Sequence, residues 1–167
     1  MPEPDYINTG ATFSPCKKYR YTLVREWSSL SDKPGYVLFI MLNPSTADET
    51  ILDPTVRRCL GYAIDWGYKK LHVVNIFALR STDPKQLYSS IDPVGVDNDK
   101  CICTEVEGAD LVIAAWGTHG SFMDRGNTIL KMTTPLSDIH YLKKTKNNIP
   151  NHPLYLKGNL LPKKWDS

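Results

Sequence analysis

Three almost unbroken runs of apolar residues stand out along the chain, at positions 36–42, 71–77 and 111–115, with a shorter segment at 139–142. Their apolar residues follow one another and do not alternate with polar ones, which is typical of strands buried on both faces of a sheet. The segment 19–27 does alternate and is rich in β-forming residues, so it predicts an antiparallel or edge strand.

Helical patterns separate these strands. Asp53 is a good N-cap, Pro54 suits the first helical position, and Gly67 ends a segment whose apolar residues recur at helical spacing. Further helices are predicted over about 98–107 and 121–132, with one helical turn around 85–88. This order predicts an α/β protein: a three-layer α/β/α sandwich whose mainly parallel, four-stranded central sheet carries an N-terminal edge strand.

The 167 residues fit a single domain, 1–167, with no linker or repeat that would divide it. Residues 1–15 contain three prolines and one glycine and are predicted to be an irregular lead-in. Residues 143–167 form a basic C-terminal segment. From Gly126 onward seven lysines stand against two aspartates, a balance of +5, which fits either contact with phosphates or a solvated surface.

Composition excludes several classes of protein. No apolar run approaches the roughly 20 residues of a membrane helix, and the N-terminus lacks the pattern of a signal peptide, so we expect a cytoplasmic protein that does not contact membranes. The four cysteines form no C-x-x-C pair and the histidines show no metal-ligand spacing. Free thiols, and neither metal nor cofactor, are therefore expected.

Polar residues collect where the predicted strands end, which is where parallel α/β sheets hold their ligands. Asn43, Pro44, Ser45 and Thr46 follow the first strand, and Asn75 lies late in the second. Trp116 and Gly117 follow the third strand, and the segment 151–153 after the fourth strand is a candidate to join them.

Several of these segments resemble a known family. LNPSTAD at 42–48, DPTVRR at 53–58, VNIFALR at 74–80 and HPLYL at 152–156 are similar to motifs of small bacterial and phage proteins catalogued as domain of unknown function 1643. The resemblance covers about 13–165 and implies no established activity.

A more distant resemblance is to the uracil-DNA glycosylase superfamily, and it implies a fold of that kind. The strand ending in Asn43-Pro44-Ser45 is similar to a Gly-x-Asn-Pro-Gly motif whose Asn positions the attacking water. Asn75 resembles the Asn that reads the base, and the strand ending in Trp116-Gly117 resembles one ending in Leu-Trp-Gly. The segment 151–154 resembles a His-Pro-Ser-Pro motif and points to His152 as the residue that stabilises the departing base. The chain has no Gln-Asp-Pro-Tyr stretch, so the water-activating Asp of that motif is missing.

Cleavage of an N-glycosidic bond places negative charge on the leaving base, so a site must donate hydrogen bonds to it and hold a water. Asn43, Asp48 and His152 are the candidate catalytic residues; their alternatives are a turn asparagine, a cap or turn carboxylate and a surface histidine. Asn75 either reads a pyrimidine edge or ties a neighbouring loop. The candidate substrate-binding residues are Pro44, Ser45, Thr46, Arg58, Asn75, Phe77, Arg80, Trp116 and Tyr155.

For several of these residues the sequence leaves a structural alternative open. Arg57 and Arg58, near the start of a helix, fit an anionic partner such as phosphate or a salt bridge to Asp53 or Glu49. The aromatic residues fit base stacking or the core.

The leading hypothesis is a uracil-DNA-glycosylase-like protein that binds a nucleobase or nucleotide and hydrolyses an N-glycosidic bond in modified nucleotides or DNA. The alternative is a non-catalytic binder of nucleotides or nucleotide signals, favoured by the missing Asp. A third hypothesis is an interaction protein with an inert pocket. Whether the chain is an enzyme is left open by the sequence, as is the choice between DNA and a free nucleotide.

Overall fold

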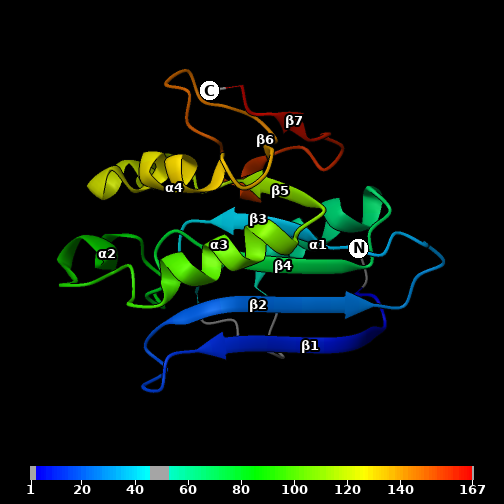
Figure 1. Ribbon diagram of the computed structural model, residues 1–167, viewed down its shortest axis with the longest axis horizontal. Coiled ribbons are helices and arrows are strands. Elements are labelled where there is room, and N and C mark those ends of the chain that lie inside the picture. The colour runs from blue at the N-terminus through cyan, green and yellow to red at the C-terminus, as the bar shows by residue number, and fades with distance from the viewer. Residues whose placement is uncertain (1–2, 46–52, 167) are drawn as a thin grey trace.

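The computed structural model describes residues 3–45 and 53–166, and within them seven strands form one sheet in the order β1-β2-β4-β3-β5-β6-β7 (Figure 1). The four middle strands, β4, β3, β5 and β6, run parallel, whereas β1, β2 and β7 pair antiparallel with their neighbours. The predicted four-stranded parallel centre is confirmed. The strands are β1 (Tyr6–Phe13), β2 (Arg20–Trp27), β3 (Val37–Met41), β4 (Lys70–Asn75), β5 (Leu111–Ala114), β6 (Ile139–Tyr141) and β7 (Lys163–Lys164).

Helices pack on both faces of the sheet. Alternate residues of β3 divide between two cores, with Phe39 packing on the side of α1 and with Leu38 and Ile40 packing on the side of α3 and α4. All three side chains are fully buried, and burial of each contributes about 1.5–3 kcal/mol. The helices are α1 (Pro54–Asp65), α2 (Lys85–Ser89), α3 (Asn98–Gly108) and α4 (Arg125–Thr133), and the 3₁₀ segments are η1 (Thr118–Asp124) and η2 (Pro153–Tyr155).

The predicted start of α1 is confirmed in its details. The Asp53 side chain accepts a hydrogen bond from the Val56 backbone N–H at 2.7 Å, and Pro54 occupies the first turn. Gly67 follows the helix with a φ of 85°, a conformation that favours glycine. Because this cap fixes where α1 begins, it also fixes which residues face the ends of β3 and β4.

Three expectations about the rest of the chain are wrong. Residues 1–15 are not an irregular lead-in, because β1 spans Tyr6–Phe13; it is largely exposed and therefore lacks a hydrophobic pattern. The segment 19–27 does form an antiparallel strand, as predicted, but because β2 pairs with both β1 and β4 it is internal and not the edge strand. The helix expected over 121–132 is split, because Phe122 and Met123 have non-helical backbone angles and α4 begins only at Arg125.

No helix among the described residues is long and apolar enough to cross a membrane.

Candidate functional site

The carboxyl ends of β3 and β4 meet the start of α1 around a cavity of about 190 Å³. The last residues of the two strands, Met41 and Asn75, are partners in the parallel register. This is the edge of the sheet at which ligands bind in α/β proteins. The lining residues are Arg20, Met41, Asn43, Ser45, Asp53, Pro54, Thr55, Val56, Val73, Asn75, His152 and Leu154.

Asn75 has a buried amide that the described residues leave unpaired. It faces the same side of β4 as Val73, and only 2% of the residue is exposed. Its backbone carbonyl accepts from the Asn98 side chain at 2.8 Å, but its Nδ2 has no hydrogen-bond partner in the part of the chain that the structure describes. Leaving such a group unpaired costs about 1–3 kcal/mol, and Nδ2 is available as a hydrogen-bond donor at the cavity.

Asn43 has a structural role and one group to spare. Its Nδ2 donates to the Ser81 carbonyl at 2.9 Å and to the Pro44 carbonyl at 3.1 Å, which ties the turn after β3 to the segment after β4. These bonds use the two amide hydrogens, so Asn43 can offer the cavity only its Oδ1, a hydrogen-bond acceptor. It therefore acts partly as the turn asparagine considered from the sequence.

A carboxylate also lines the cavity, and it belongs to Asp53, which the sequence did not identify as a site residue. Besides capping α1, Asp53 accepts a hydrogen bond from the Ser45 hydroxyl through Oδ2. In the sequence its roles as a helix cap or a salt-bridge partner are sufficient, so no local signal marks it as a site residue. The predicted Asp48 and Thr46 lie outside the described residues.

A buried cation, Arg20 of β2, lines the same cavity and is 1% exposed. Sequence reasoning missed it because Arg20 lies in an alternating strand that was expected to be at the edge of the sheet. An arginine at the first position of a strand that continues into apolar residues was the available signal. Because Asp53 also lines it, the cavity contains side chains of both signs of charge.

His152 reaches the cavity from the segment before η2. Its Nδ1 accepts a hydrogen bond from the Leu154 backbone N–H at 3.3 Å, so in the neutral ring the proton is on Nε2. Burial lowers the pKa of His152, and the nearby Asp53 carboxylate opposes this with a smaller effect. At neutral pH the ring is therefore uncharged, with Nε2–H as its one donor.

Residues 20–154 match the model of a family described as protein of unknown function (DUF1643). The chain belongs to this family. All the residues that line the cavity lie within the matched range, so the cavity belongs to the shared DUF1643 region. No curated protein and no solved structure matches the chain.

In this DUF1643 chain the other predicted site residues do not line the cavity. Trp116 is buried in the core on the far side of the sheet, as is Phe77, whose ring lies 5.8 Å from that of Phe122. Tyr155 is 91% exposed. Arg80 lies over the Phe13 ring, with 4.8 Å between the guanidinium and the ring centroid, and Arg58 lines a separate hollow. The structure thus brings together Asn43, Ser45, Asn75 and His152, while Pro44 is buried beside them.

Gly117 holds the His152 segment against the end of β5. Its N–H donates to the Pro150 carbonyl at 2.9 Å, its φ of 79° and ψ of −174° favour glycine, and a Cβ added there would lie 3.1 Å from the His152 Cβ.

We expect Gly117→Ala to lower the free energy of unfolding by about 1–3 kcal/mol, measured in urea, and to displace His152. Gly10→Ala is the control, because its Cβ would meet only Val24 at 3.9 Å. Equal effects of the two substitutions would contradict this account.

Proposed function

We propose that this DUF1643 protein binds a nucleobase, carried by a nucleoside or nucleotide, in the cavity at the ends of β3 and β4. The buried Nδ2 of Asn75, which has no partner among the described residues, is the observation that carries the proposal, because a base carbonyl or ring nitrogen would satisfy it. The volume of about 190 Å³ is below the roughly 300–1,000 Å³ of pockets for drug-sized ligands and favours a single flat ring.

The other groups around the cavity support the same class of ligand. His152 supplies a second donor through Nε2–H, and Asn43 supplies an acceptor through Oδ1. The edge of uracil or thymine presents carbonyl acceptors beside a ring N–H donor, which complements this set. Met41, Val73 and Leu154 provide apolar surface for the faces of the ring.

Hydrolysis of an N-glycosidic bond is the second candidate function, and the Asp53 carboxylate favours it. Each carboxylate oxygen carries two lone pairs, so Asp53 can accept a hydrogen bond from a water in addition to those from Val56 and Ser45. His152 would donate to the departing base. Asn43, Asn75 and His152, in chain order around strand ends, support a uracil-DNA-glycosylase-like fold as part of this proposal.

The hydrogen bonds of Asn43 and Asp53 favour a protein that binds its ligand without catalysing a reaction. Both amide hydrogens of Asn43 and both oxygens of Asp53 already hold the protein together, which is the arrangement of a pocket wall rather than of a free catalytic group. A non-catalytic nucleotide-binding protein would use the same Asn75 and His152 contacts.

Binding and chemistry can be separated in one series of measurements. The protein is titrated by calorimetry with the five common bases and their nucleosides, and then incubated with those nucleosides and with uracil-containing DNA. Saturable binding of one base at one site per chain is the expected result, and chromatography shows whether that base is released or the ligand is recovered intact. Absence of binding by every base and nucleoside would overturn the proposal.

A further inference from the structure

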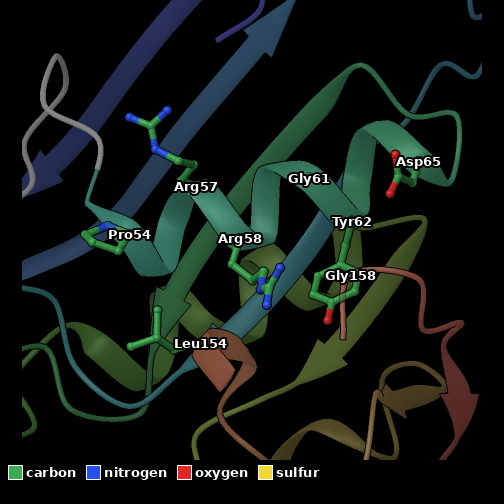
Figure 2. Close-up of a pocket in the computed structure, with 8 residues that line it drawn as sticks. All are labelled: Pro54, Arg57, Arg58, Gly61, Tyr62, Asp65, Leu154 and Gly158. Carbon is green, nitrogen blue, oxygen red and sulfur yellow. The ribbon is translucent and has the colours of Figure 1, made fainter. Parts of the chain in front are cut away.

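A larger hollow, of about 500 Å³, lies beside the base cavity along α1. In Figure 2 Arg58 and Tyr62 extend from α1 toward the side of Leu154 and Gly158. Pro54 and Leu154 line both this groove and the cavity, so the two hollows adjoin. A molecule whose base fills the cavity would extend from there into the groove.

The end of the groove next to the cavity is positively charged. Arg57 and Arg58 lie at the start of α1, where the first turn contains no acidic residue and the helix dipole is positive. The carboxylate that lines the groove belongs to Asp65, which is about 10 Å further along the helix axis than Arg58 at 1.5 Å per residue. The Asp53 carboxylate caps this end of the helix and offsets part of this charge, so the start of α1 presents two arginines against one carboxylate.

The present partners of the two arginines leave them able to bind an anion. Arg57 pairs with Glu3 at 3.2 Å, but the two side chains are 46% and 44% exposed, and a pair of this kind contributes little. Arg58 donates to the Leu156 carbonyl through Nη2, which leaves other N–H groups of its fork for a phosphate. Gly61 and Gly158 contribute no side chains to the groove, which keeps it open.

We infer that this groove binds the phosphate of the nucleotide whose base occupies the cavity, through Arg58, while Arg57, whose side chain extends to the other side of α1 in Figure 2, adds positive charge at the edge of the groove. The inference rests on the proposed function and extends it from a base to a phosphate ester. That ester belongs either to a free nucleotide or to a nucleic-acid strand, since both offer the same group at this distance from the base.

The test compares uridine, uridine monophosphate, a five-nucleotide deoxyuridylate strand and inorganic pyrophosphate as ligands in calorimetry. We expect the monophosphate to bind about tenfold more tightly than uridine, because it adds hydrogen bonds to a charged group. Arg57→Gln combined with Arg58→Gln is expected to remove this gain and leave uridine binding unchanged. Lys85→Gln combined with Lys131→Gln, which removes two exposed lysines elsewhere, is the matched control. Because Arg58→Gln also removes the bond to Leu156, Arg57→Gln alone is measured as a variant that keeps the fold.

The outcomes separate this inference from the proposed function. The inference about the groove would be overturned by equal affinities of uridine and its monophosphate, or by a gain in affinity that survives the double substitution. Neither result would contradict base binding in the cavity. If pyrophosphate binds through the two arginines and no nucleoside binds, the groove is an anion site, but the proposal that the cavity binds a nucleobase is overturned. Tighter binding of the strand than of the monophosphate, with a salt dependence that falls by about one for each arginine removed, identifies nucleic acid as the source.

Discussion

Replacement of Asn75 with leucine is expected to weaken nucleobase binding while raising the free energy of unfolding of the unliganded protein. Leucine is similar in size to asparagine but has no polar group, so it removes a buried donor that the described residues leave unpaired. Relief of that group is worth about 1–3 kcal/mol in the absence of ligand. The same contact, lost from the complex, weakens binding by about 5- to 150-fold.

The opposite signs of the two effects make this prediction specific. Urea unfolding gives the stability and calorimetry gives the affinity, both for wild type and variant. Thr133→Val is a suitable control, because the Thr133 hydroxyl is buried but donates to the Ile129 carbonyl at 2.7 Å, away from the cavity. Its replacement is expected not to raise stability and not to change binding. A less stable Asn75→Leu protein that still binds the ligand would show that the amide serves the fold alone.

The centre of the fold was predictable because its determinants are local. Buried parallel strands are apolar at every position, as in Val37–Met41, and the cap at Asp53 followed by Pro54 marks a helix start without reference to distant residues. The edge was not predictable in this way. The exposed strand β1 is defined by its pairing with β2, and pairing between strands leaves little trace in composition.

The site shows the same division between local and distant information. Asn43, Asn75 and His152 could be expected together because polar residues at the ends of parallel strands converge on one edge of a sheet. Arg20 and Asp53 could not be expected at the site, because the local sequence already explains Arg20 as a strand residue and Asp53 as a helix cap. Trp116 and Phe77 were predicted at the site but do not lie there. Side-chain alternation decides whether an aromatic residue near a strand end faces the ligand or the opposite core, and both of these face the core.

His152→Asn is expected to weaken ligand binding about tenfold at neutral pH and, where base release is measurable, to slow it about 100- to 1,000-fold. Asparagine can still accept the Leu154 N–H and so preserve the cap of η2, but it lacks a donor at the position of Nε2. Base release suffers more than binding because the donor matters most when negative charge develops on the departing base. His152→Gln, which can place an amide N–H close to the original Nε2, is expected to restore part of both activities.

The pH dependence of stability gives a second test of the same ring. The pKa of His152 is lowered in the folded state by burial, so between that pKa and the ordinary value near 6.5 the unfolded chain binds more protons. Stability from this residue is therefore complete above about pH 6.5 and is lost as the pH falls through the folded-state pKa. The difference in free energy of unfolding between wild type and His152→Asn, followed from pH 8 to pH 5, isolates this contribution from the other histidines. A difference that stays constant over that range would mean that the ring is not desolvated. It would contradict the account in which burial keeps His152 neutral with Nε2–H as its donor.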